Sequence, residues 1–106
     1  MADRTSFPAE LAGSSVDCDF GAFAPRLTFG ASGLRVQATI YETKIDEVVD
    51  ATVTAIRPHV FSMSWVEKSG NFIVQVQDHE NGIVHNYARL VSGNLFCAQG
   101  ALRPVN

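Results

Sequence analysis

The sequence predicts an all-β protein: a small antiparallel up-and-down barrel of seven to eight strands, with a short N-terminal arm or helix. From residue 25 onward, apolar and polar side chains alternate with a period of two, which is typical of half-buried β-strands. The later connections are short and contain glycine, whereas parallel strands need crossovers of about a dozen residues. A long twisted meander protects its edges by closing, so we expect a barrel.

The N-terminal segment differs in composition from the rest of the chain. We expect an arm over residues 1–23 and a barrel domain over residues 24–106. Within the arm, Pro8 favours a short helix that reaches Leu11, with Ser6 in a position to cap it. The sequence shows no internal repeat, and 106 residues suffice for one domain.

The predicted strands follow one another at short intervals. The clearest alternation runs from Leu34 to Tyr41, where every second residue is apolar. The other segments with strand character cover residues 27–29, 49–55, 59–66, 72–77, 83–90 and 95–102. Glycine supplies the positive φ that tight turns require, and it occurs in the connections 30–33, 68–71, 80–82 and 92–94.

The charge balance excludes some classes of partner. Eight Lys and Arg residues stand against eleven Asp and Glu residues, which gives a net charge of −3. Binding to nucleic acid or to an anionic membrane needs a concentrated positive patch, so we expect neither. No apolar run approaches the roughly 20 residues that span a bilayer.

The expected compartment is the cytoplasm, because no apolar secretory core follows the N-terminus. In a reducing cytosol, Cys18 and Cys97 should stay thiols and serve as small packing residues. A disulfide between them is the alternative that the sequence leaves open.

Several strands carry polar groups together with bulky aromatic ones. His59, Phe61, Met63 and Trp65 share one face of a single segment, and Gln75 alternates with valines in the next. A simple packed sandwich would show one clean apolar face on each strand. The mixture indicates a mostly apolar cavity with a few fixed polar groups, and a solid core is the alternative.

Two stretches carry a family resemblance. Residues 55–67 contain Ile56-Arg57-Pro58 and lead into Ser64-Trp65, and residues 70–80 contain a valine-rich strand that ends at Asp78. The chain from about residue 25 to 102 is similar to MoaF-like domains, which also carry a glycine before the closing strand, as at Gly100 here.

The resemblance implies a lipocalin-like, calycin-type small barrel. Founding members are named for an association with molybdenum cofactor biosynthesis, and longer members carry two such domains. This chain has room for one, so the resemblance carries over the fold and not a molybdenum role.

The chemical motifs are sparse. His79 and His85 flank the turn at residues 80–82, and two histidines with a carboxylate would suit a transition metal. Their spacing matches no recognised motif, so we expect no metal and no cofactor. Ser62 and Ser64 lie mid-strand without the strained Gly-x-Ser-x-Gly turn of a nucleophile, and no phosphate-binding loop is present.

The leading hypothesis is binding of a small apolar or aromatic molecule inside the barrel. The candidate ligand contacts are Tyr41, Arg57, His59, Phe61, Met63, Trp65, Gln75, His85, Tyr87 and Arg89. One alternative is a small calycin-like enzyme, an isomerase, cyclase or decarboxylase, that moves protons with Tyr, His and Arg, with Glu67 also available. The other is a structural module without a ligand that forms a homodimer through an exposed sheet face.

Overall fold

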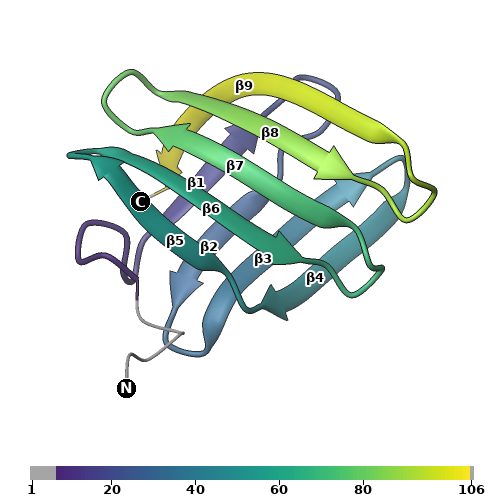
Figure 1. Cartoon of the computed structure of the whole chain (residues 1–106), viewed down its shortest axis with the longest axis horizontal. Coiled ribbons are helices and arrows are strands. Elements are labelled where there is room, and N and C mark those ends of the chain that lie inside the picture. The colour runs from purple at the N-terminus through teal and green to yellow at the C-terminus, as the bar shows by residue number, and fades with distance from the viewer. Residues whose placement is uncertain (1–6, 106) are drawn as a thin grey trace.

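Nine β-strands form one antiparallel sheet in the computed structural model, which describes residues 7–105 (Figure 1). The strands are β1 (Ser15–Asp19), β2 (Arg26–Gly30), β3 (Gly33–Ile40), β4 (Thr43–Val49), β5 (Thr52–Arg57), β6 (Val60–Val66), β7 (Phe72–Asp78), β8 (Ile83–Arg89) and β9 (Leu95–Val105). No helix occurs in this range, so none there could span a membrane. The predicted all-β class is confirmed, with nine strands in place of seven to eight.

The sheet follows the chain order almost throughout. Its strand order is β4-β3-β2-β1-β9-β8-β7-β6-β5, so every pair is consecutive in sequence except β1 and β9. The β1–β9 pair joins the two ends of the chain, with Cys18 opposite Leu102. The predicted antiparallel meander is therefore confirmed.

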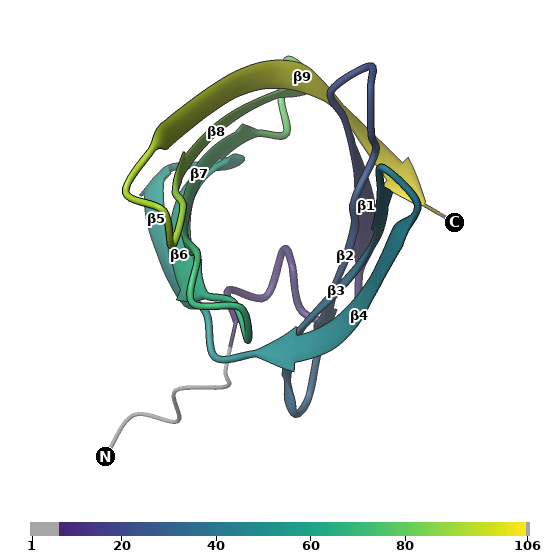
Figure 2. The same ribbon diagram turned by 90° about the vertical axis from the view of Figure 1, so that its right-hand side faces the viewer.

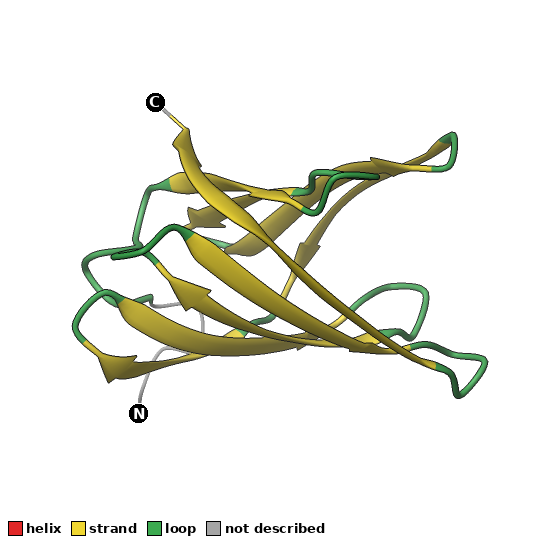
Figure 3. Cartoon of the chain, turned by 90° about the horizontal axis from the view of Figure 1, so that it is seen from above, coloured by secondary structure: helices red, strands yellow, loops and turns green. Residues whose placement is uncertain are grey.

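The predicted closure of the barrel is not observed. The sheet curls round on itself (Figures 2 and 3), but β4 and β5 stand at its two edges and no pairing joins them. Only Asp50 and Ala51 connect these strands. On the β4 side, the Glu47 carboxylate accepts a hydrogen bond from the backbone N–H of Lys68 at 2.7 Å, so β4 meets the β6–β7 turn instead of β5.

Two strands of the sheet were not predicted from the sequence. β1 lies inside the predicted arm and pairs with both β2 and β9, so the second half of that segment belongs to the sheet. β4 carries Lys44, Asp46 and Glu47, whose charges hide its alternation. β1 is short, and in β4 a charged residue stands at an inward position, so neither strand stands out by periodicity alone.

The predicted helix from Pro8 to Leu11 is wrong. This segment forms a turn in which the backbone N–H of Leu11 donates to the carbonyl of Pro8 at 2.8 Å. The proposed cap, Ser6, lies outside the described residues. Leu11 is fully buried, and the turn crosses one end of the curled sheet (Figure 2).

The core consists of the inward faces of the curled sheet. Alternate residues of β1, β2, β3, β6, β7 and β8 point inward and pack against one another across the interior. Cys18 is one of them, fully buried and free, as expected. Cys97 is also free but exposed on β9, so its predicted packing role is wrong.

The close approach of β9 to the end of β1 gives a stability prediction. A Cβ atom at Gly100 would collide with the carbonyl oxygen of Asp19 and lie 2.8 Å from Cδ1 of Phe20. We expect Gly100→Ala to lower the free energy of unfolding by about 1–3 kcal/mol, because backbone must move to admit the methyl group. Urea unfolding followed by circular dichroism measures this change.

Gly30→Ala is the matched control. The nearest atom to a Cβ at Gly30 is the carbonyl oxygen of Gly33 at 3.6 Å, an ordinary contact. We expect a change within about 0.5 kcal/mol for this variant. Equal destabilisation by the two variants would contradict the assigned role of Gly100.

Candidate functional site

A cavity of about 330 Å³ opens between the two halves of the curled sheet. Its volume is at the lower end of the range for pockets that hold small organic molecules. Most of its lining is apolar, and buried side chains such as Leu27, Val36, Ile73 and Ala88 form its inner part. Such a cavity favours a ligand with a large apolar surface.

Aromatic rings gather in the less buried part of the lining. Phe20 and Phe23, from the β1–β2 loop, lie 5.4 Å apart between ring centroids, and Phe23 lies 6.1 Å from Phe96 on β9. Tyr41 also lines the cavity, from the β3–β4 turn, where it is 87% exposed. These rings place stacking surfaces around the opening of the cavity.

Four polar side chains interrupt the apolar lining: Glu67, Asn71, Gln75 and Asn86. Gln75 and Asn86 face each other directly across the β7–β8 pair. The Gln75 Nε2 donates to Asn86 Oδ1 at 2.9 Å, and both residues are buried. This pair fixes an amide surface in the wall of the cavity.

The amide pair continues as a buried chain of hydrogen bonds along β7. Gln77 Nε2 donates to Gln75 Oε1 at 2.8 Å, and His79 Nε2 lies 2.9 Å from Gln77 Oε1. Because Gln77 Oε1 is an acceptor, His79 Nε2 carries the proton of this bond. The Cys18 thiol points at the same Gln75 oxygen. Burial raises the pKa of this thiol to about 12. Mutual bonding satisfies these buried groups.

The Trp65 indole and the Glu67 carboxyl lie two residues apart on the cavity wall. The Trp65 N–H is buried and has no hydrogen-bond acceptor in the described part of the protein. Burial raises the pKa of Glu67, the charge of Glu47 adds to the rise, and Asn71 opposes it with a hydrogen bond at 3.5 Å. Trp65 is close enough to favour the charged carboxylate, although the two groups do not reach hydrogen-bonding geometry.

Three of the predicted ligand contacts line this cavity: Tyr41, Trp65 and Gln75. Phe61 and Met63 point inward on the same face of β6 but belong to the packed core, and Phe61 makes an edge contact with the His79 ring. These two residues therefore support the cavity without lining it.

The other five predicted contacts lie away from the cavity. His85, Tyr87 and Arg89 alternate with the buried residues of β8, so they lie on the outer face of the sheet. The inward residues of that strand include Asn86, which the sequence analysis did not select. Arg57 and His59 come from the β5–β6 end of the sheet.

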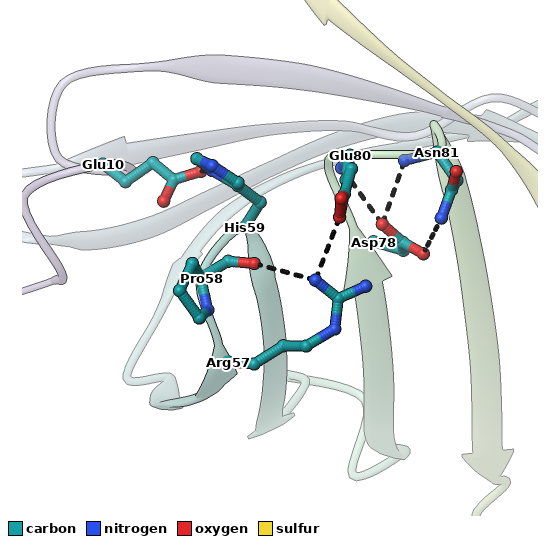
Figure 4. Close-up of polar contacts among 7 residues, drawn as sticks. All are labelled: Glu10, Arg57, Pro58, His59, Asp78, Glu80 and Asn81. Carbon is teal, nitrogen blue, oxygen red and sulfur yellow. Dashed lines mark hydrogen bonds and ion pairs between the residues drawn. The ribbon is translucent and has the colours of Figure 1, made fainter.

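Arg57 and His59 belong to a surface network (Figure 4). Arg57 pairs with Glu80 at 3.0 Å, and His59 Nδ1 lies 2.7 Å from the Glu10 carboxylate. Asp78 accepts hydrogen bonds from the backbone and side chain of Asn81, which hold the pKa of Asp78 below its usual value. The network ties the N-terminal segment and two turns together, so it has a structural role.

The sequence-based metal candidates do not assemble. His79 is half-buried and bonded to Gln77, whereas His85 lies opposite Val76 on the outer face. Among residues 7–105, no three His, Cys, Asp or Glu side chains gather as metal ligands.

Residues 12–103 match the MoaF-like family model. The chain belongs to the MoaF-like family. The sequence resemblance is thereby confirmed, and the match also takes in β1. No curated protein is similar enough to this MoaF-like chain to match it.

A solved structure shares the MoaF-like fold. It is a protein from Burkholderia vietnamiensis described as a "putative beta-lactamase". The two chains share 16% sequence identity with a TM-score of 0.85, over 94% of this chain and 100% of the other. At this identity the similarity establishes the common fold alone.

The pKa values of His59 and His79 should be shifted in opposite directions. Hydrogen bonding and charge from Glu10 raise the pKa of His59, whereas burial lowers that of His79. The His59 contribution to stability is complete below an unfolded pKa of about 6.5 and is lost as the pH rises through the folded pKa. For His79, stability falls as the pH drops from about 6.5 towards the lower folded pKa.

Two-dimensional NMR of the imidazole rings against pH tests this assignment. We expect His59 to titrate above His79, and Glu10→Gln to lower the pKa of His59 while His79 stays below its ordinary value. The reverse order of titration in the unaltered protein would contradict the structure.

Proposed function

We propose that the protein binds a small, largely apolar aromatic molecule in its interior cavity. The observation that carries the proposal is the cavity of about 330 Å³, with buried aliphatic side chains inside and aromatic rings at its opening. Burial of apolar ligand surface supplies about 25 cal/mol per Å², and the few polar groups set the orientation.

We infer further that the open sheet is a lipocalin-like, calycin-type barrel. The nearly sequential strand order and the interior cavity support this inference, although β4 and β5 remain unpaired. In such barrels the interior is the ligand site. A cytoplasmic location stays a prediction.

The enzymatic alternative receives less support. Arg57, His59, His85 and Arg89, which acid–base chemistry would use, do not line the cavity. The titratable side chains that do line it are Tyr41 and Glu67, and Tyr41 is almost fully exposed. We therefore propose binding without turnover, and recovery of unchanged probe after incubation with the protein is the expected result.

Filling the cavity tests the proposed site. Ala88 is buried in the lining, so Ala88→Leu would occupy ligand space. With 2-acetylnaphthalene as an uncharged aromatic probe, we expect a rise in Tm for the unaltered protein, because a ligand stabilises the state that binds it. The variant should bind the probe at least about tenfold more weakly, a loss of roughly 1.4 kcal/mol, when measured by calorimetry.

Ala55→Leu makes the same change at an exposed position on β5, away from the cavity. It should bind the probe as the unaltered protein does. Undiminished probe binding by Ala88→Leu would show that the binding site lies elsewhere. An equal loss of probe affinity in both variants would indicate damaged folding.

Self-association is a second proposal, supported by the outer face of β6–β9. Val66, Phe72, Tyr87 and Leu95 expose 59%, 43%, 48% and 74% of their surfaces there or at its margin. Clustered apolar exposure of this kind is typical of protein contacts.

Light scattering after size exclusion tests a homodimer through this face. We expect twice the mass of the 11.5 kDa chain, and a monomer for Tyr87→Lys. Tyr41→Lys, which alters an exposed tyrosine in the β3–β4 turn, should stay dimeric. A monomeric unaltered protein would exclude the proposal.

A further inference from the structure

An unpartnered hydrogen-bond donor lies on the cavity wall. Trp65 is 4% exposed and lines the cavity, and its indole Nε1–H has no acceptor within residues 7–105. The nearby Glu67 carboxylate attracts this donor but does not reach hydrogen-bonding geometry with it. A buried donor without a hydrogen-bonded acceptor loses its hydration and recovers little of it, so native proteins rarely keep one. The cavity beside Trp65 is the space from which a ligand can supply the acceptor.

A second donor faces the same cavity because the amide chain has a direction. His79, Gln77 and Gln75 each donate to the next member, and the last acceptor is Asn86 Oδ1. The other end of that amide, Asn86 Nδ2, is therefore a donor on a residue that lines the cavity. β6, β7 and β8 present Trp65, Gln75 and Asn86 on one inward wall.

The charge on the lining restricts the ligand further. Glu67 is the one charged side chain among the described residues that line the cavity, with no Lys, Arg or His beside it. An anionic ligand would meet a carboxylate and no counter-charge in a partly desolvated site, which is unfavourable. An uncharged acceptor meets donors without this repulsion.

We propose that the cavity selects uncharged aromatic carbonyl compounds, whose carbonyl oxygen accepts a hydrogen bond from Trp65 Nε1, with Asn86 Nδ2 as the second donor on that wall. The proposal rests on the proposed function of the cavity as a ligand site. A carbonyl oxygen has two lone pairs and carries no charge, so it suits a donor-rich wall next to Glu67.

Three probes of nearly the same shape test the effect of the hydrogen-bond acceptor and the effect of the ligand charge separately. 2-Acetylnaphthalene carries the carbonyl, 2-isopropenylnaphthalene replaces its oxygen with CH₂, and 2-naphthoate replaces its methyl group with a charged oxygen. By calorimetry we expect the ketone to bind about fivefold to tenfold more tightly than the alkene, which is the value of one hydrogen bond. The carboxylate should bind most weakly.

The single tryptophan of the chain gives a direct signature. Its one indole ¹H–¹⁵N cross-peak should move downfield when the ketone binds, because a hydrogen bond deshields the indole proton. The alkene, which stacks without accepting, should lack this downfield component. A shift that is the same for both probes would overturn the assignment of Trp65 as the donor.

Two variants test the roles of the named groups. Trp65→Phe keeps an aromatic ring but removes the N–H, so the ketone should lose its advantage over the alkene. Glu67→Gln removes the charge, so 2-naphthoate should gain affinity relative to the ketone. Tyr87→Phe, which changes a polar group on the outer face, should leave all three affinities unaltered.

The outcomes distinguish the two proposals. Binding of all three probes with equal affinity, or strongest binding of the carboxylate, would overturn the specificity for carbonyl compounds and leave the cavity as a ligand site. Failure of all three to bind would overturn both. Ketone preference that persists in Trp65→Phe would show that another group supplies the donor and would refute the role of Trp65.

Discussion

Over residues 7–105 the chain forms one sheet and no helix, so the sheet has only itself to pack against, and this constraint shapes the fold. A strand face rich in Phe61, Met63 and Trp65 must leave water, and a single sheet can bury it only by curling until its two halves face each other. The pairing of β1 with β9 makes the curl continuous through both ends of the chain. The halves do not meet fully, and the remaining space between them is the cavity.

The sequence predicts the inward faces better than the strand count. Alternation, β-branched and aromatic residues and the glycine-containing turns identify β2, β3 and β5–β9. These features miss β1, which is short and lies among loop-like residues. They also miss β4, where the charged Glu47 takes an inward position and the apolar Val48 an outward one. Whether β4 pairs with β5 depends on the path of Asp50 and Ala51 and on the contact of Glu47 with Lys68, which no periodicity encodes.

The site was predicted in part. The face that holds Trp65 and Gln75 follows from alternation, but the choice between the two faces of β8 requires the register across the turn at Asn81 and Gly82. With Gln77 opposite Val84, Asn86 must lie opposite Gln75, and His85 must point outward. That register could have been obtained from the turn itself. The contact between the aromatic residues of the β1–β2 loop and β9 could not have been predicted, because it arises only in the folded sheet.

The cavity and its polar wall thus follow from the same curl that buries the core. The most direct test is to record intermolecular nuclear Overhauser effects between bound 2-acetylnaphthalene and the methyl groups of the protein. We expect contacts from the naphthyl protons to Ile73, Ala88 and Leu27, whose side chains line the cavity. Contacts to Val66 and Val74, which lie on the outer face, with none to the cavity methyl groups, would contradict binding inside the curled sheet.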